Sequence, residues 1–353
     1  MTTKSRKIVM ARRFDGMPQV SDFALQEETL APLEDGDVLC ETVWLSVDPY
    51  MRSYSRNMKE GDVMMGQTLS KVVESRHPNY VVGDLVLYYS GWRDQYVVKN
   101  PDDPRPWPLQ KVNYIPEGHP STLSLGVLGM PGATAYFGLN EICKPVKSGE
   151  TVVVNAAAGA VGAVVGQLAK SQGCRVVGFA GTDEKVEYLR ELGFDEAVNY
   201  KTMGSLEDVL CSLCPNGIDI YFDNVGGSFS DTVMSHMNQF GRVSVCGCIS
   251  QYNNTGQSIG PRLQGLLISK QIRMEGFLVH RWKDQWMECM EALGALVREG
   301  KMKYRETTVD GFERAPEALI GMLQGENIGK MIVKCQSGGS GGDGDGDGEQ
   351  CKQ

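Results

Sequence analysis

The sequence predicts an α/β protein in which a barrel-like β domain is followed by a doubly wound parallel sheet. Residues 5–125 contain short runs rich in β-branched and aromatic residues, separated by Gly and Pro turns. From residue 151, apolar strand patterns alternate with helical patterns. Residues 328–334 are again a strand pattern, so we expect the chain to return to its first domain.

The expected strands of the first domain are short and closely spaced. Turn signals such as EDGD, VGD and NPDDPRPWP separate them, and this density of Gly and Pro favours a barrel over a sandwich of long strands. The strand-like runs cover residues 37–47, 67–75, 84–90 and 94–98.

Near residue 122 the pattern changes. Residues 122–142 predict a helix pair interrupted at Met130-Pro131-Gly132, and TVVVN (151–155) is the continuous apolar run of a strand covered on both faces. Alternation of this kind predicts a twisted parallel sheet. Helices are expected at 160–174 and 183–193, and further strands at 175–180, 218–227, 241–250 and 272–279.

The last part of the chain returns to β structure. Its expected elements are a closing helix at 284–301, an extended segment at 302–309, a short helix at APEALIGMLQG and the strand 328–334. We therefore expect residues 1–124 and 310–336 to form one domain and residues 125–309 the other. Residues 337–353 are too rich in Gly and Asp to bury a core, which predicts a disordered tail.

Composition and charge exclude several function classes. The 353-residue chain has a net charge of −9, which argues against a nucleic-acid partner. No apolar run of about 18 residues appears, and the N-terminus lacks the apolar block of a secretory signal, so we expect no membrane association. The ten cysteines lie mostly in or beside apolar runs, as free thiols do in a reducing cytosol, and we expect a cytoplasmic protein.

A dinucleotide fingerprint follows the strand at 151–155. Aligned on G-x-G-x-x-G, the chain has Ala157-Ala158-Gly159-Ala160-Val161-Gly162, with a strand before the turn and a helix after it. Gly159 lets the backbone approach a pyrophosphate at the helix N-terminus, and Gly162 lets helix and strand pack closely. Ala157 replaces the first Gly, and the alternative is a Gly-rich turn that binds nothing. The context favours a Rossmann dinucleotide site.

The end of the second strand indicates which dinucleotide binds. NAD enzymes place Asp or Glu there to hold the ribose hydroxyls, but this strand ends at Ala180 without an acid. Asp183 and Glu184 follow in the first turn of an expected helix, where acids complement the dipole. Lys185 is placed to meet a 2′-phosphate, unless it is only a solvated helix residue. We therefore expect NADPH/NADP+ as the cofactor.

No metal site is expected from the sequence. Cys211-x-x-Cys214 stands alone, without the second pair of a zinc ribbon. The ligand set that a zinc alcohol dehydrogenase needs around an open metal position is missing. The histidines form no cluster along the chain; they are His77, His119, His236 and His280.

Several collinear stretches between residues 47 and 334 are more specific than the glycine motif. They are VDPYMR, EGDVMMGQ, GMPGATAYFGL, ETVVVNAAAGAVG, DEKVEYLRELGFD, NYKT, YFDNVGG, RMEGF, DGFERAP and GENIGKMIVK. In these the chain resembles zinc-independent members of the medium-chain dehydrogenase/reductase superfamily. More narrowly, it is similar to the prostaglandin reductases (leukotriene B4 12-hydroxydehydrogenases) and the alkenal and alkenone reductases. The resemblance implies a GroES-like β-barrel domain beside a Rossmann domain, and a homodimer.

The resemblance implies roles for residues that match the family motifs. Lys185 and Tyr200 would take the 2′-phosphate region, and Asn224 the ribose or nicotinamide, although Asn224 and Asn327 are also ordinary turn residues. The pyrophosphate would lie on Gly159, Ala160, Val161 and Gly162. Further cofactor contacts are implied for Cys246, Gly247, Cys248, Ile249, Ser250, Gln251, Tyr252, Phe277, Leu278, Val279 and Asn327.

A serine stands where related enzymes carry a tyrosine proposed to contact the substrate carbonyl. This residue is Ser269, four residues before the Arg-Met-Glu segment, and its hydroxyl donates over a shorter reach. Tyr50 in VDPYMR is the other candidate for orienting the carbonyl, unless it is only a packed tyrosine, and Tyr252 is a weaker one. Tyr50 and Ser269 are therefore the expected catalytic residues.

The resemblance implies NADPH-dependent reduction of the carbon–carbon double bond of α,β-unsaturated ketones and aldehydes. Negative charge would develop on the carbonyl oxygen, where hydroxyl donors take the place of a metal. Expected substrates are lipid-derived enones and alkenals, such as 15-oxoprostaglandins, with NADP+-dependent oxidation of the leukotriene B4 12-hydroxyl as a further reaction. Two alternatives stay open: an NADPH quinone reductase of the same superfamily, and a crystallin-like protein that binds NADPH without turnover.

Overall fold

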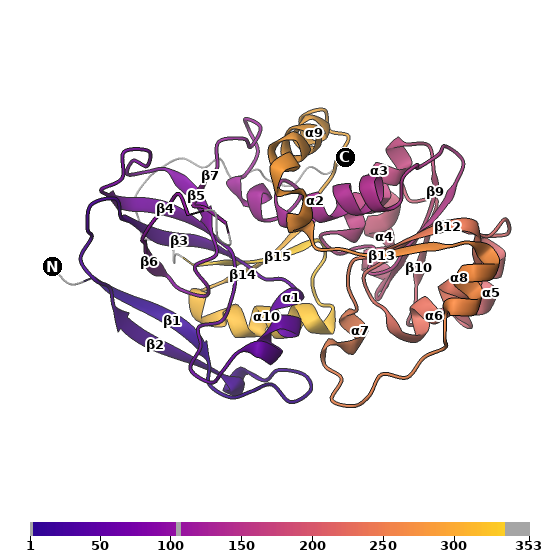
Figure 1. Cartoon of the computed structure of the whole chain (residues 1–353), viewed down its shortest axis with the longest axis horizontal. Coiled ribbons are helices and arrows are strands. Elements are labelled where there is room, and N and C mark those ends of the chain that lie inside the picture. The colour runs from indigo at the N-terminus through magenta and orange to yellow at the C-terminus, as the bar shows by residue number, and fades with distance from the viewer. Residues whose placement is uncertain (1–2, 104–106, 336–353) are drawn as a thin grey trace.

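The computed structural model describes residues 3–103 and 107–335, and the tail predicted at 337–353 lies outside the described residues. Figure 1 shows two units side by side, a β-rich unit that carries the N-terminus and an α/β unit. The predicted α/β fold class, with a barrel-like domain and a parallel sheet, is confirmed. No helix among the described residues is long and apolar enough to cross a membrane.

The β-rich unit is built on a seven-stranded sheet with the order β14-β15-β3-β4-β5-β7, and β6 also pairs with β3. Two register shifts in the β3–β4 pair, after Leu39 and after Thr42, bend the sheet as closure of a barrel requires. A separate ribbon of β1 (Lys4–Met10) and β2 (Phe23–Thr29) packs beside it. The sheet strands are β3 (Val38–Ser46), β4 (Thr68–Ser75), β5 (Leu85–Tyr88), β6 (Gln95–Val98), β7 (Gln110–Lys111), β14 (Glu306–Asp310) and β15 (Lys330–Lys334).

The α/β unit contains a six-stranded, wholly parallel sheet with the order β10-β9-β8-β11-β12-β13. The order reverses between β8 and β11, and in such sheets ligands bind beyond the carboxyl ends of the strands at this point. The strands are β8 (Thr151–Val154), β9 (Arg175–Ala180), β10 (Glu196–Asn199), β11 (Ile218–Asp223), β12 (Met237–Val245) and β13 (Arg273–Gly276).

Helices cover both faces of this sheet because successive buried strand residues point to opposite sides. Val152 and Val154 pack with residues of α2, α3 and α9, whereas Val153 packs with residues of α5 and α6. The helices of the unit are α2 (Met130–Phe137), α3 (Gly162–Ser171), α4 (Asp183–Glu191), α5 (Leu206–Leu213), α6 (Gly227–Ser235), α7 (Ile249–Tyr252), α8 (Gln264–Lys270) and α9 (Trp286–Arg298).

Two local predictions need correction. The expected interruption at Met130-Pro131-Gly132 is the start of α2, with proline in its first turn, where its missing N–H is not needed. A short 3-10 helix, Ser121–Leu125, precedes it in place of a first α-helix. The strand expected at 241–250 ends at Val245, and residues from Ile249 onward form α7 instead.

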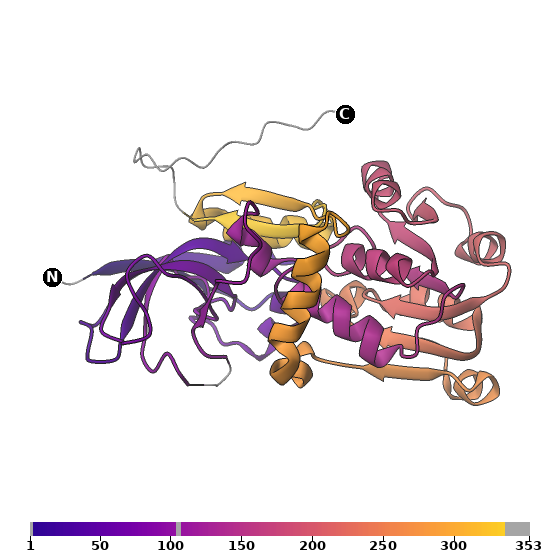
Figure 2. The same cartoon turned by 90° about the horizontal axis from the view of Figure 1, so that it is seen from above.

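The chain crosses back to the β-rich unit after α9, which lies between the two units in Figure 2. Strand β14 pairs with β15 in parallel, and β15 pairs with β3, so the return begins at Glu306. The division into domains at residues 124, 309 and 336 stays a prediction. Two short helices complete the β-rich unit, α1 (Tyr50–Tyr54) and α10 (Ala315–Gln324).

Candidate active site

The glycine-rich turn joins β8 to α3, as the fingerprint predicts. A Cβ at Gly162 would lie 2.6 Å from the Ala156 carbonyl oxygen, so only glycine allows this close approach of helix and strand. Within the described protein, the backbone amides of Ala160, Val161 and Gly162 have no acceptor. These orphan donors lie at the N-terminus of a ten-residue helix, where the dipole also favours an anion. The turn therefore fits a pyrophosphate.

Lys185 and Tyr200 both lie beyond the carboxyl end of β9. The Tyr200 ring leans on Gly181, where a Cβ would lie 3.0 Å from the phenol oxygen. Asp183 accepts a hydrogen bond from Asn199 Nδ2 at 2.7 Å, which ties this carboxylate to the protein. The Asp183 carboxylate, which follows the strand end next to the expected phosphate position, is therefore held in place by Asn199.

A second cation that the sequence analysis missed lies near Lys185. Burial lowers the pKa of Lys185, and the positive charge of Lys201 lowers it further. Lys185 Nζ donates to the Gly325 carbonyl oxygen at 2.6 Å, which leaves two of its three donors for a ligand. Two lysines at one strand end suit the double charge of a 2′-phosphate. The available signal was Lys201 directly after Tyr200 in NYKT.

Asn224 lies at the carboxyl end of β11 and is turned toward β8. Its Nδ2 donates to the Asn155 carbonyl oxygen at 2.9 Å, and its backbone N–H donates to Asn155 Oδ1 at 2.7 Å. The buried Asp223 accepts from Asn155 Nδ2 at 2.9 Å and from Ser230 Oγ at 2.7 Å. This network joins the carboxyl ends of β8 and β11, the two strands on either side of the switch point. Sequence analysis missed Asn155 and Asp223, although each is a polar residue that ends an apolar strand.

The loop from Cys246 to Tyr252 is anchored beside the same strand end. The Cys246 and Gly247 amides donate to the Asp223 carbonyl oxygen at 2.8 and 3.1 Å, and the Cys248 amide donates to Tyr252 Oη at 3.4 Å. Burial, with a smaller contribution from the charge of Asp223, raises the pKa of Cys246 to about 12, so this thiol stays neutral. The other predicted loop residues, Ile249, Ser250 and Gln251, lie in the short helix α7.

Two arginines of the β-rich unit hold this loop from the other side. Buried Arg52 donates through Nε to Asn253 Oδ1 at 2.7 Å and through Nη2 to the Gly16 carbonyl oxygen at 2.8 Å. Arg56 donates to the Tyr252 carbonyl oxygen at 3.2 Å. The helix that begins with Tyr50 is thus joined directly to the predicted cofactor loop.

The segment around Asn327 contacts the glycine turn. Gly329 N donates to the Ala158 carbonyl oxygen at 2.8 Å, and Gly329 pairs with Gly159 as an isolated parallel bridge. Asn327 Nδ2 donates to the Gly329 carbonyl oxygen at 2.7 Å. The Asn327 side chain therefore stabilises the turn at Gly329, which contacts the predicted pyrophosphate site.

Phe277, Leu278 and Val279 follow the carboxyl end of β13. Phe277 packs edge-on against Trp282 with ring centroids 5.7 Å apart, and Val279 is buried. Leu278 is 56% exposed, so it has an apolar surface free to cover a ligand. The roles of all these residues stay predictions, but the structure brings them to one edge of the parallel sheet.

Tyr50 is the first residue of α1 and projects a buried hydroxyl. Its Oη has no hydrogen-bond partner within the described protein. Burial raises the pKa of Tyr50 well above its ordinary value, and the charge of Asp48 adds to the rise. Asp48 itself is bonded to the buried Lys330 Nζ at 2.8 Å. A neutral, dry and unpaired hydroxyl is a donor available to a ligand.

Ser269 lies elsewhere. It is exposed on α8, and its hydroxyl donates to the Leu266 carbonyl oxygen at 3.3 Å, a local bond within the helix. Helix α8 packs on β12, and Figure 1 shows it at the outer end of the α/β unit, away from α1. These surroundings do not support a substrate role for Ser269 within one chain, because Tyr50 and Ser269 are not brought together.

One group of potential metal ligands occurs among the described residues, Glu207, Cys211 and His236. It lies on α5 and directly after α6, on the face of the sheet that α5 and α6 cover, and not at the glycine turn. His236 Nε2 pairs with the Glu207 carboxylate at 3.2 Å. Cys214, the other cysteine of the CxxC sequence, is buried and absent from this group.

Comparisons with known proteins agree with this geometry. Family models match residues 6–105, described as the N-terminal domain of oxidoreductase, and residues 160–295, described as zinc-binding dehydrogenase. Prostaglandin reductase 1 of Oryctolagus cuniculus is 52% identical over 93% of this chain and 92% of its own length. The NADP+-dependent 2-alkenal reductase of Nicotiana tabacum is 41% identical over 93% of this chain and 97% of its own.

A solved relative extends the similarity to three dimensions. The crystal structure of CurA in complex with NADPH from Vibrio vulnificus has a TM-score of 0.86 at 39% identity, and the match covers 94% of this chain and 100% of that chain. Sequence and structure agree over nearly the whole length. The chain therefore belongs to the prostaglandin reductase family of the medium-chain dehydrogenase/reductase superfamily.

Proposed function

We propose that this protein uses NADPH to reduce the carbon–carbon double bond of α,β-unsaturated ketones and aldehydes. The observation that carries the proposal is the buried, unpaired hydroxyl of Tyr50, on a helix bonded to the loop beside the free amides of the glycine turn. The relatives named as prostaglandin reductase and 2-alkenal reductase support this substrate class. Within it we propose 15-oxoprostaglandins and 2-alkenals, with leukotriene B4 12-hydroxyl oxidation by NADP+ as a further reaction.

The residues present define what the protein contributes to this reaction. NADPH bound at the glycine turn would supply the hydride for the β-carbon of the enone. Tyr50 donates a hydrogen bond to the carbonyl oxygen, where negative charge develops as the β-carbon accepts the electron pair. Because its pKa is raised, Tyr50 stays protonated and acts as a donor. A proton from water at the α-carbon completes the addition of two hydrogens across the double bond.

We propose that the reaction needs no metal and takes place in the cytoplasm. The hydroxyl donor provides the stabilisation that a Lewis acid would provide in a zinc dehydrogenase. The Glu207–Cys211–His236 group does not touch the glycine turn or Tyr50. The free cysteines, several of them buried with raised pKa values, suit a reducing compartment.

We further propose a homodimer formed through β13. This strand ends the six-stranded sheet and pairs with β12 alone among the described strands, so its outer edge is unpaired. Met274 on β13 is 39% exposed, and Ile268 on the adjacent α8 is 77% exposed. An uncovered edge strand with apolar neighbours is a template for pairing with a second copy around a two-fold axis. Light scattering on a size-exclusion column measures the mass that tests this.

The experiment that tests the activity follows NADPH consumption with an enone, with a quinone and without an acceptor. We expect consumption with nonenal or a 15-oxoprostaglandin and recovery of the product with a saturated carbon–carbon bond and an intact carbonyl. Consumption with quinones alone would favour the quinone reductase alternative. Tight NADPH binding without turnover on any acceptor would favour the crystallin-like alternative.

A further inference from the structure

Two exposed side chains of α5 and a histidine at the end of α6 bring three different metal-binding groups together. Glu207 and Cys211 are one helical turn apart on α5, so both lie on the same face of the helix. His236 follows α6 directly. One carboxylate oxygen, the Cys211 sulfur and one His236 ring nitrogen all lie within 4.8 Å of one another. A carboxylate, a thiol and an imidazole are therefore available to the same ion.

The His236 ring has a nitrogen without a hydrogen bond. His236 Nε2 is buried and has no hydrogen-bond partner among the described residues. It lies 3.2 Å from a Glu207 oxygen, but not in the geometry of a hydrogen bond. A buried polar atom without a partner costs free energy, and a metal ion that binds the imidazole removes that cost. Cys211 is a free, exposed cysteine beside this nitrogen.

The surrounding backbone holds the three groups in place. Leu210 of α5 packs with Val233 of α6 in one buried core, so the two helices are fixed against each other. The His236 carbonyl oxygen accepts from the Ile218 amide at 3.1 Å. Lys270 Nζ donates to the carbonyl oxygens of the residues before and after His236, at 2.8 and 2.7 Å. Binding an ion therefore requires movement of two exposed side chains and not of the backbone.

The ligand types and their spacing suit Zn²⁺. Zinc binds Cys sulfur at about 2.3 Å, and His nitrogen and carboxylate oxygen at about 2.0–2.2 Å, in a tetrahedron. Such bonds place the ligand atoms about 3.3–3.7 Å apart. Rotation of the exposed Glu207 and Cys211 side chains closes the present spacing of at most 4.8 Å to this value. The Cys211 proton passes to water as the zinc–sulfur bond forms, and the thiolate and carboxylate then balance the two charges of the ion.

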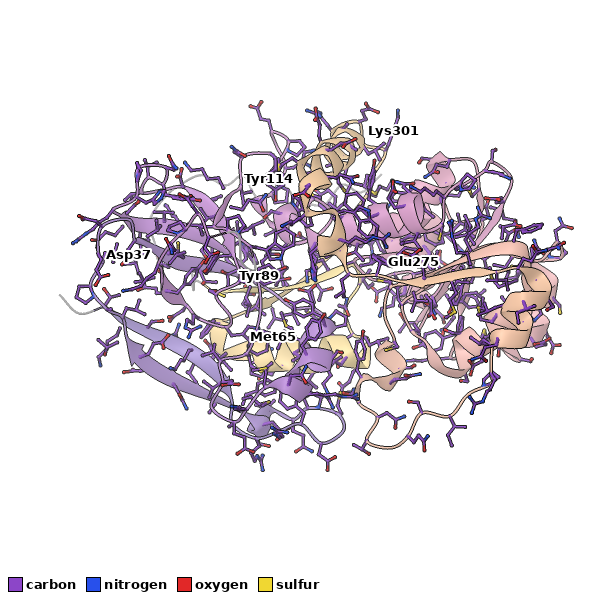
Figure 3. All side chains as sticks on the ribbon, viewed as in Figure 1. Asp37, Met65, Tyr89, Tyr114, Glu275 and Lys301 are labelled. Carbon is purple, nitrogen blue, oxygen red and sulfur yellow. The ribbon has the colours of Figure 1, made fainter. Side chains whose placement is uncertain are left out.

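We propose that Glu207, Cys211 and His236 bind one Zn²⁺ ion, with water as the fourth ligand, and that this site joins α5 to the end of α6. The site is separate from the proposed reaction. Figure 1 shows α5 at the outer end of the α/β unit, and α6 packs against it. Met65, which packs on the same core as Tyr50, lies toward the middle of the molecule in Figure 3, well away from α5. Bound zinc stabilises the fold and takes no part in the reduction.

Cobalt is the probe that tests the site, because a cobalt–thiolate bond gives a charge-transfer absorption band that zinc abolishes on displacing cobalt. We expect the chelator-treated protein to bind one equivalent of Co²⁺ with this band. Cys211→Ser should lose the band and bind Zn²⁺ at least about 100-fold more weakly, since loss of even an outer-shell group costs about 10- to 100-fold. His236→Asn should weaken zinc binding to a similar extent. Because Cys211 is exposed, its variant remains informative if His236→Asn folds poorly.

The matched control is His77→Asn. His77 Nε2 also lies 3.2 Å from a carboxylate, that of Asp102, and its side chain is 11% exposed against 14% for His236. No cysteine joins that pair among the described residues. This variant should keep the cobalt band. Cys351→Ser, which removes a thiol outside the described residues, should keep it too.

Thermal unfolding provides a second measurement that does not depend on the band. Saturating Zn²⁺ should raise the unfolding midpoint of the wild type by about 2–4 °C and leave that of Cys211→Ser unchanged. A wild type without the cobalt band would overturn the inference. So would an equal band in Cys211→Ser, or loss of the band in His77→Asn or Cys351→Ser.

Discussion

Replacement of Lys185 by alanine is the sharpest test of the cofactor assignment. Lys185 lies at the carboxyl end of β9 with Tyr200 and near Lys201, and its amine is already within hydrogen-bonding distance of the Gly325 carbonyl oxygen. NADPH and NADH differ in this region by a single phosphate. The variant should therefore weaken NADPH binding and leave NADH binding nearly unchanged.

The expected loss of NADPH affinity in Lys185→Ala follows from the loss of one charge-assisted hydrogen bond. Such a bond contributes about 1.5–3 kcal/mol, which corresponds to a loss of about 10- to 150-fold in affinity. The lower half of that range is expected here, because the positive charge of Lys201 remains near this position and water can replace the lost donor. Raising the salt concentration should reduce the difference in NADPH affinity between the wild type and Lys185→Ala, since exposed charges are screened over about 8–10 Å.

The assay measures dissociation constants of both cofactors by the quenching of tryptophan fluorescence. Lys170→Ala is the matched control, because it removes one positive charge from the same unit at an exposed ion pair with Asp195, whose atoms are 2.9 Å apart. It should change neither affinity by more than two-fold. Equal loss of NADH and NADPH affinity in Lys185→Ala would mean that Lys185 is a structural helix residue and that this reasoning is wrong.

The pH dependence of the preference for NADPH over NADH gives a second test of Lys185. Because its pKa is lowered, Lys185 loses its charge at a lower pH than an ordinary lysine does. The 2′-phosphate loses its second charge on acidification below about pH 6. The ratio of NADH to NADPH dissociation constants should therefore be largest near neutral pH and fall on either side. In Lys185→Ala the fall on the alkaline side should become smaller.

Four further outcomes are expected. Gly162→Ala should weaken NADPH binding by at least ten-fold in titrations, because its Cβ would lie 2.6 Å from the Ala156 oxygen. Tyr50→Phe should lower kcat with enones by about 10- to 100-fold at unchanged NADPH affinity, and an unaltered kcat would reassign Tyr50 to packing. Lys330→Met should lower the free energy of unfolding, measured in urea, by about 3–5 kcal/mol, because Asp48 stays buried without its partner. Chelators should leave the rate intact, and recovery of a lost rate by zinc would contradict the metal-free proposal.

Some parts of the site were predictable because their residues are consecutive. The turn from Gly159 to Gly162 carries its whole signal in one short stretch, between a recognisable strand and helix. The end of the strand expected at 241–250 was not predictable in the same way. Residues after Val245 turn back because the Cys246 and Gly247 amides find their acceptor on Asp223, in another strand. The apolar pattern of residues 241–250 alone does not indicate that Asp223 is the acceptor for these amides.

Contacts between distant residues account for most of what the sequence analysis missed. Lys330 and Asp48 are 282 positions apart, and their pairing depends on β15 lying against β3. A partial signal did exist, because Lys330 directly precedes the apolar run Met331-Ile332-Val333. A lysine that is buried with such a run needs a carboxylate partner. Its partner was not identifiable, because several acids of the first domain fit the same pattern.

The return of the chain to its first domain has a physical role in the site. Gly329 donates to the glycine turn at Ala158, and the next residue, Lys330, donates to the Val47 carbonyl oxygen at 2.6 Å and to Asp48. Two consecutive residues therefore touch both the predicted pyrophosphate turn and the segment that leads into Tyr50. A chain that ended after α9 would keep the parallel sheet and strands β3 to β7, but it would lose β14, β15 and this link. The returning chain thus holds the segment before Tyr50 and the glycine turn at a set separation, as hydride transfer to a bound enone would require.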